Sequence, residues 1–182
     1  METRTVISCD DCGAFWDPAA EAAACTDLSH EHHQRSDSHL HRSRVVLPDG
    51  TEVTAVSFGS ADPYAREAPP DFGLYLDEHW APQWDHAQLP WVDFGVPDAD
   101  ALRVALEDLL DRARRGERVE VGCLGGHGRT GTALACLAVL TGTPPGEAVA
   151  WVRSVYCEKA VETDEQRAFV AAFDPTVPAR DS

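Results

Sequence analysis

The residues with the clearest chemical potential lie in one glycine-rich segment, VGCLGGHGRTGTALA, at residues 121–135. The segment contains one thiol, Cys123, and one guanidinium, Arg129, six positions apart. An apolar strand-like run precedes it and an apolar helix-like run follows it. A loop that leads from a strand into a helix presents backbone N–H groups and the positive end of the helix dipole, and both attract anions. The segment therefore predicts an anion site beside a cysteine.

The glycines and the arginine of this loop indicate which anion would bind. Such a backbone can curl tightly and turn its amides toward a common centre, through Gly125, Gly126, Gly128 and Gly131. This arrangement stabilises the thiolate form of Cys123, and Arg129 offers a planar fork to two oxygens of a phosphate. A nucleophile and an oxyanion cradle in one loop fit covalent phosphoryl transfer. A Walker-type nucleotide loop does not fit, because no lysine precedes Thr130.

Two further motifs accompany the loop in the sequence. Cys-x5-Arg followed by Thr130 resembles the signature of the superfamily of cysteine-dependent protein tyrosine and dual-specificity phosphatases. Upstream, WVDFGVPD at residues 91–98 is similar to the mobile Trp-Pro-Asp loop of that family. Downstream, AVETDEQRAF at residues 160–169 resembles the segment whose glutamine positions the hydrolytic water. The three motifs occur in the family's order and cover about half of the chain, roughly residues 91–173.

The resemblance implies a role for each matched residue. Cys123 would attack phosphorus in line, while Arg129 and the loop amides hold the equatorial oxygens. Thr130 would hydrogen-bond the sulfur and make it a better leaving group. Asp93 would protonate the leaving oxygen and later accept a proton from the water that Gln166 positions. This chemistry requires no metal or other cofactor.

The residues inside the loop also bear on the substrate. The predicted phosphate-binding set is Leu124, Gly125, Gly126, His127, Gly128 and Arg129. Leu124 and His127 occupy positions where lipid phosphatases of the superfamily carry lysines, which favours a phosphoprotein or small monoester over a polyphosphoinositide or an RNA 5′-triphosphate. His127 is equally compatible with a solvent-facing loop position. The sequence departs from the family pattern where histidine, proline and glutamine are usual, at Gly122, Val92 and Glu162.

A second candidate site lies in the cysteine- and histidine-rich head at residues 1–41. CDDCG at residues 9–13 has the Cys-x2-Cys spacing of a zinc knuckle. The predicted ligands of a structural zinc ion are Cys9, Cys12, Cys25 and His30, with His32 or His33 as substitutes for the last. Unliganded thiols beside a solvated histidine cluster are the alternative. A redox pair is disfavoured, because no thioredoxin-like strand–helix pattern surrounds the cysteines.

The elements that position the loop alternate between strand and helix patterns. The predicted elements are a hairpin at 44–59, strands within 71–80 and at 118–122, and helices at 99–116, 130–142, 144–156 and 163–173. Asp98 fits the N-cap of the first helix, and Thr163 with Gln166 fits a capping box on the last. The order indicates an α/β fold, a phosphatase-like central sheet flanked by helices.

The domain organisation follows from these patterns. We expect a zinc-binding head at residues 1–41, a cysteine-dependent phosphatase domain at residues 42–177 and a tail at residues 178–182. The length of 182 residues suits one domain of ordinary size with a small appendage.

Composition narrows the class of protein. The net charge of −16 disfavours nucleic acid or an anionic membrane as a partner. No apolar run approaches the roughly 18–20 residues that span a bilayer, and the N-terminus has no signal-peptide pattern, so we expect a cytoplasmic protein. Lysine occurs only at Lys159, while arginine and alanine are abundant, a bias typical of GC-rich bacterial genes.

The sequence thus predicts a bacterial phosphatase that hydrolyses phosphomonoesters, with a phosphoprotein of tyrosine or dual specificity as substrate, through a cysteinyl-phosphate. The alternative is a catalytically weak phospho-binding module with the same fold. Rhodanese-like sulfur transfer would leave Asp93 and Gln166 without a role. An arsenate reductase would require paired reducing cysteines within reach of Cys123.

Overall fold

The structure is a computed structural model that describes residues 44–58, 68–78, 80 and 82–176. It also describes the backbone of two short antiparallel strands, β1 (Ile7–Ser8) and β2 (Phe15–Trp16). The predicted zinc ligands Cys9, Cys12, Cys25 and His30, with the substitutes His32 and His33, lie outside the described residues. The zinc site and the boundaries of the head and tail therefore stay predictions.

A five-stranded mixed sheet forms the centre of the fold, in the order β3-β4-β7-β5-β6. Its strands are β3 (Arg44–Val46), β4 (Glu52–Ser57), β5 (Phe72–Tyr75), β6 (His86–Gln88) and β7 (Val119–Cys123). β3 and β4 form the predicted antiparallel hairpin, and the other neighbouring strands run parallel. The hairpin turn contains Gly50 with φ 88°, a left-handed conformation that glycine adopts without strain.

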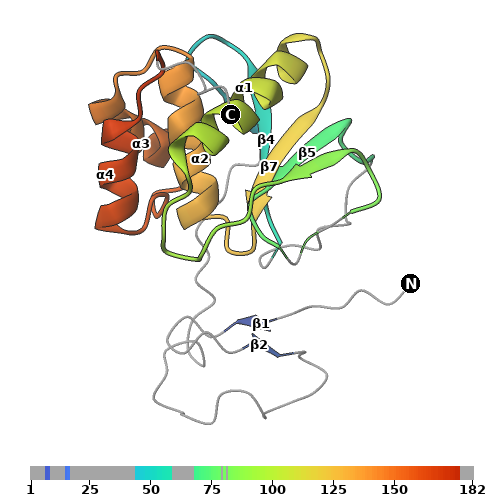
Figure 1. Ribbon diagram of the computed structural model, residues 1–182. Coiled ribbons are helices and arrows are strands. Elements are labelled where there is room, and N and C mark those ends of the chain that lie inside the picture. The colour runs from blue at the N-terminus through green and yellow to red at the C-terminus, as the bar shows by residue number, and fades with distance from the viewer. Residues whose placement is uncertain are drawn as a thin grey trace.

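Four helices lie on one face of this sheet (Figure 1). They are α1 (Ala99–Arg114), α2 (Gly128–Leu140), α3 (Pro145–Val155) and α4 (Asp164–Ala172). α1 and α2 pack against the sheet, while α3 and α4 pack against α2. α2 is buried from Gly128 to Val139 because it has neighbours on both sides, in agreement with the apolar helix-like run in the sequence. Within the described part of the chain, no helix is long and apolar enough to cross a membrane.

Side-chain caps fix the starts of α1 and α4 as predicted. Asp98 Oδ1 accepts a hydrogen bond from the backbone N–H of Ala101 at 2.9 Å. At α4, Thr163 Oγ1 accepts from Gln166 N at 3.1 Å, and Gln166 Oε1 accepts from Thr163 N at 3.3 Å, which completes the capping box. A cap of this kind contributes about 1 kcal/mol to stability.

The parallel strands bring their carboxyl ends to one edge of the sheet. Ser57 at the end of β4 pairs in register with Cys123 at the end of β7. Tyr75 at the end of β5 pairs with Gly122, so Asp77 lies just beyond the same edge. Open α/β sheets bind ligands outside the carboxyl ends of their strands. The fold therefore places the cysteine loop where such a site is expected.

Candidate active site

The Cys123 sulfur lies at the centre of the loop that joins β7 to α2. It is 2% exposed and accepts two hydrogen bonds, from Gly126 N at 3.3 Å and from Thr130 Oγ1 at 3.1 Å. Both donors favour a negative charge on the sulfur. The structure thus brings the predicted nucleophile and Thr130 together. It also identifies Gly126 N as one loop amide that donates to the sulfur.

The path of the loop depends on glycine at two positions. Gly126 has φ 75°, in the left-handed region that residues with a Cβ rarely adopt. Gly128 lies against the start of the α4 segment: a Cβ there would be 2.5 Å from Glu162 Oε2 and 2.9 Å from Gln166 Nε2. Glu162 and Gln166 therefore contact the loop, as their place in the predicted motif requires.

Arg129 is buried and surrounded by oxygen atoms. Its Nη2 lies 2.8 Å from Asp77 Oδ2, and its Nη1 donates to the backbone oxygens of Leu76 and Trp91, each at 3.2 Å. Its Nε lies 3.4 Å from Asp93 Oδ1 and makes no hydrogen bond to the described residues. The Nε–H group of Arg129 is therefore a buried donor that could form a hydrogen bond to a bound oxyanion.

Asp77 is a site residue that sequence reasoning missed. Its side chain is 7% exposed, and the Arg129 side chain is 8% exposed, so the two form a buried ion pair. A buried guanidinium is costly unless a counter-ion compensates it, and Asp77 supplies that compensation. The sequence shows only that Asp77 follows the apolar run at residues 72–76, because its place beside the loop depends on the sheet order.

The loop around Asp93 is attached to the rest of the site at three points. Arg129 donates to Trp91 O, Thr163 Oγ1 donates to Phe94 O at 3.1 Å, and Gln166 Nε2 donates to Gly95 O at 3.2 Å. The Asp93 side chain is 56% exposed, so it faces both Arg129 and solvent. These contacts hold a carboxyl group beside the guanidinium without the proline usual in the family's acid loop.

Gln166 connects this acid loop, residues 91–97, with the start of α4. The side chain is fully buried, its Oε1 accepts from Glu162 N at 2.9 Å, and its Nε2 donates to Gly95 O. The same amide lies against Gly128 of the cysteine loop. One side chain thus contacts all three predicted motifs.

Gly122, which departs from the family pattern, is explained by packing. A Cβ at this position would lie 2.5 Å from the backbone oxygen of Val56 and would also clash with that residue's side chain. The close approach of β4 to β7 therefore excludes the histidine that is usual here.

Two further cysteines among the described residues, Cys136 and Cys157, are buried. Burial raises the pKa of both Cys136 and Cys157, which leaves them as thiols.

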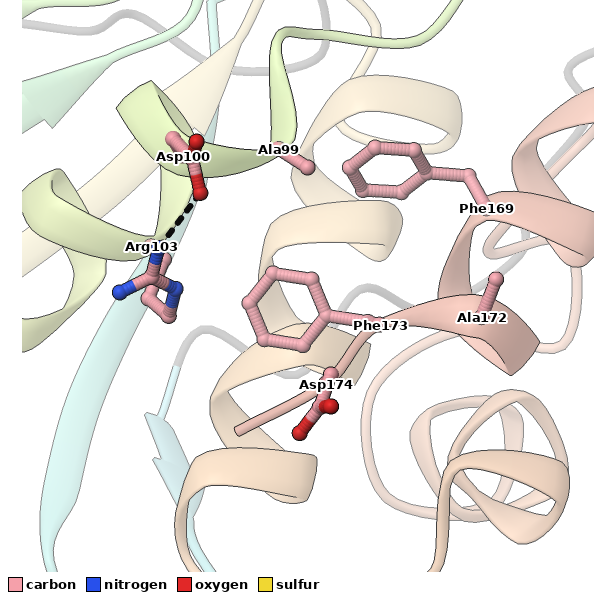
Figure 2. Close-up of a pocket in the computed structure, with 7 residues that line it drawn as sticks. All are labelled: Ala99, Asp100, Arg103, Phe169, Ala172, Phe173 and Asp174. Carbon is pink, nitrogen blue, oxygen red and sulfur yellow. Dashed lines mark hydrogen bonds and ion pairs between the residues drawn. The ribbon is translucent and has the colours of Figure 1, made fainter. Parts of the chain in front are cut away.

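A pocket of about 190 Å³ lies between α1 and α4 (Figure 2). Phe169 and Phe173 point their rings into it, and Arg103 in its lining pairs with Asp100 at 2.6 Å. None of residues 121–135 lines it, so it is separate from the cysteine loop. Among the described residues, no cluster of three or more histidine, cysteine or carboxylate side chains fits a metal ion.

Comparisons with known proteins agree with this geometry. Residues 73–170 match the family model described as PTP-SAK: Swiss Army Knife protein, DSP-PTPase phosphatase domain. Two uncharacterized proteins of Methanocaldococcus jannaschii are 36% and 35% identical in alignments of 110 residues, which cover 55% of this chain and 74% and 68% of theirs.

Solved structures give the same result. Tk-PTP in its active form has a TM-score of 0.59 and 25% identity, over 76% of this chain and 100% of its own. PTPMT1 in complex with PI(5)P has a TM-score of 0.51 at 18% identity, over 57% of this chain and 76% of its own, and shows the shared fold alone.

The fold and these matches define a cysteine-based phosphatase of the tyrosine and dual-specificity type. The chain belongs to the DSP-PTPase phosphatase domain family of the Swiss Army Knife proteins.

Proposed function

We propose that this phosphatase hydrolyses phosphomonoesters in two steps, through a cysteinyl-phosphate on Cys123. One observation carries the proposal: a buried sulfur accepts hydrogen bonds from Gly126 N and Thr130 Oγ1 within the loop that ends at Arg129. Such hydrogen bonds position the sulfur for nucleophilic attack on phosphorus. The adjacent Arg129 guanidinium has a buried N–H without a hydrogen-bond partner among the described residues.

In the first step, the Cys123 thiolate forms an S–P bond as the P–O bond to the leaving group breaks. Arg129 and the loop amides bind the equatorial oxygens, whose charge is spread over three atoms in the transition state. Asp93 lies 3.4 Å from the guanidinium and gives its proton to the leaving oxygen.

In the second step, water attacks phosphorus and the S–P bond breaks, with its electron pair returning to sulfur. Thr130 Oγ1 and Gly126 N stabilise the thiolate that forms. Asp93 accepts a proton from the attacking water, which Gln166 orients from its position beside Gly128, and inorganic phosphate leaves.

The surroundings of Asp93 favour a monophosphorylated peptide with an apolar flank. Val92 and Phe94 on either side of it are 82% and 56% exposed. We infer that these two side chains contact the residues that flank the phosphorylated side chain. The neighbouring carboxyl groups of Asp77 and Glu162 disfavour polyphosphorylated substrates, because each adds like-charge repulsion. A phosphotyrosyl or phosphoseryl protein is therefore the proposed substrate, with tyrosine or dual specificity.

The test compares hydrolysis of a phosphotyrosyl peptide and of 4-nitrophenyl phosphate by the full chain and three variants. Cys123→Ser should abolish turnover of both substrates, while Cys136→Ala, which removes a thiol from the core of α2, should retain it. Asp93→Asn should slow hydrolysis of the peptide by about 100-fold and that of the nitrophenyl ester by less, because nitrophenolate leaves without protonation.

Chelator should change neither rate, because no step uses a metal. Turnover that survives in Cys123→Ser, or that chelator removes, would contradict the mechanism. Binding of phosphate by the unaltered protein without any turnover would instead assign it as a phospho-binding module.

We also propose that the head at residues 1–41 binds one structural zinc ion through Cys9, Cys12, Cys25 and His30. The support is the Cys-x2-Cys spacing in the sequence. Metal analysis of the purified chain should find one zinc per molecule, and Cys9→Ser should lower that content while hydrolysis continues. A metal-free native protein would contradict this site.

A further inference from the structure

The direction of each peptide group in the cysteine loop decides whether the loop can bind an anion. In a trans peptide the carbonyl oxygen and the N–H point in opposite directions. The described residues contain no cis peptide bond. A donor that binds a loop carbonyl therefore turns the following N–H away from that donor.

Three carbonyls of this loop accept hydrogen bonds from donors outside it. Leu124 O accepts from Ser57 Oγ at 3.0 Å, and Gly126 O accepts from Tyr156 Oη at 2.7 Å. His127 O accepts from the backbone N–H groups at positions 131 and 161, at 3.0 and 3.2 Å. The N–H groups that follow, at positions 125, 127 and 128, therefore point away from these donors. Two of these three carbonyls depend on a side-chain hydroxyl from another element.

The two hydroxyls come from different elements of the fold. Ser57 ends β4 and pairs in register with Cys123 on β7. Tyr156 follows α3 directly and is 2% exposed. Burial raises the pKa of Tyr156, so its hydroxyl stays a donor.

The strand that carries the nucleophile cannot provide this support itself. Gly122 precedes Cys123, and β4 leaves no space for a side chain there, because an added Cβ would lie 2.5 Å from Val56 O. A side chain at position 122 therefore cannot orient the loop, whereas hydroxyls from other parts of the fold do donate to its carbonyls.

We propose that the hydroxyls of Tyr156 and Ser57 are positioning groups, which turn the peptide groups of the 123–129 loop so that their N–H bonds converge on a tetrahedral oxyanion. This inference rests on the proposed function, since it concerns the loop that would hold the phosphoryl group. Neither hydroxyl takes part in bond making or breaking. Each acts through the carbonyl that it binds.

The experiment measures binding of tungstate to the full chain by isothermal titration calorimetry. Tungstate is a stable tetrahedral dianion, so its affinity reports on the cradle without any chemical step. Tyr156→Phe removes one oxygen atom and should weaken tungstate binding about five- to tenfold, the range expected when one hydrogen bond to a preorganised group is lost. Ser57→Ala should weaken it by a similar factor, and Ser57→Thr, which keeps the hydroxyl, should restore the affinity.

The matched control is Tyr75→Phe. Tyr75 is also a buried phenol, but its hydroxyl donates to Glu120 Oε1 and accepts from Trp84 Nε1, each at 2.6 Å. Removing it leaves the buried Glu120 without that donor, so this variant should unfold more easily and still bind tungstate with unchanged affinity. A loss of affinity confined to the Tyr156 and Ser57 variants thus separates positioning from general stability.

Several outcomes would overturn the assignment. They are unchanged tungstate affinity in Tyr156→Phe, an equal loss in Tyr75→Phe, or failure of the unaltered protein to bind tungstate. Because no turnover is measured, the result is independent of the two-step mechanism. A protein that binds tungstate as expected but hydrolyses nothing would refute the proposed function and leave the positioning role supported.

Discussion

Replacement of Asp77 by asparagine should destabilise the protein and increase the stabilisation that a bound oxyanion provides. Asp77 Oδ2 lies 2.8 Å from Arg129 Nη2, and both side chains are less than one-tenth exposed. The asparagine side chain would keep an oxygen that can accept from Arg129, but it would leave the buried guanidinium without that negative partner. The expected effect therefore comes from charge more than from the loss of a hydrogen bond.

The magnitude follows from the burial of the pair. Removing one partner of a buried ion pair costs about 3–5 kcal/mol. Because asparagine keeps an oxygen that can accept from Arg129, we expect Asp77→Asn to lower the free energy of unfolding by about 3 kcal/mol. For a domain of this size, such a loss lowers Tm by roughly 10 °C. Asp93 Oδ1 lies farther from the guanidinium, at 3.4 Å, and its side chain is largely exposed, so it compensates only partly.

The assay is thermal unfolding by circular dichroism, with and without saturating tungstate. Bound tungstate places negative charge beside Arg129, so it should raise the Tm of Asp77→Asn more than that of the unaltered protein. The control is Asp71→Asn, at the opposite end of the same strand. Asp71 pairs with Arg118 at 2.9 Å, but the two side chains are 44% and 60% exposed, and the loss should be much smaller.

Two results would refute this reasoning. If Asp77→Asn and Asp71→Asn unfold at the same temperature, Asp77 is not a buried counter-ion. If tungstate stabilises Asp77→Asn less than the unaltered protein, Asp77 contributes to anion binding and does not compete with it.

Further predictions concern packing, the acid loop and the cysteines. Gly122→Ala should lose about 1–3 kcal/mol of stability, because its Cβ would overlap Val56 O; chemical denaturation checks this, and an unchanged midpoint would contradict the packing. Thr163→Ala should cost about 1 kcal/mol through the lost cap and should also lower turnover, because the bond to Phe94 O is lost, whereas Thr163→Ser should retain both. Since burial raises the pKa of Cys157, iodoacetamide at neutral pH should leave that residue unmodified in native protein, which peptide mass spectrometry measures; rapid native labelling would mean that the site is open.

The part of the site that the sequence predicts is the part that the chain builds locally. Cys123, Arg129 and the glycines between them lie on one loop, so their spacing alone places a thiol, amides and a guanidinium around one centre. The capping box is also local, and it determines where Gln166 can reach. The acid loop can be located as well, because a helix with a well-marked N-cap follows it directly.

The supporting residues could not be predicted in the same way, because they depend on which strands become neighbours. Asp77 faces Arg129 only because β5 lies beside β7, and Ser57 reaches the loop only because β4 lies on the other side. The three-residue strand β6, with the sequence HAQ, has no apolar pattern and is formed by pairing with β5. Tyr156 resembles an ordinary core residue in sequence.

These non-local residues share one physical task, which is to compensate polar groups that the loop buries. The loop turns its amides toward an anion, and its carbonyls must then find donors on the other side, which Ser57 and Tyr156 provide. It also buries a guanidinium, which needs the carboxylate of Asp77. A short motif can therefore identify a reactive loop, but only the sheet order shows how the charges and peptide groups of that loop are balanced. Substitutions at Asp77, Ser57 and Tyr156 should accordingly alter anion binding while the nucleophile, the arginine and the motif itself remain intact.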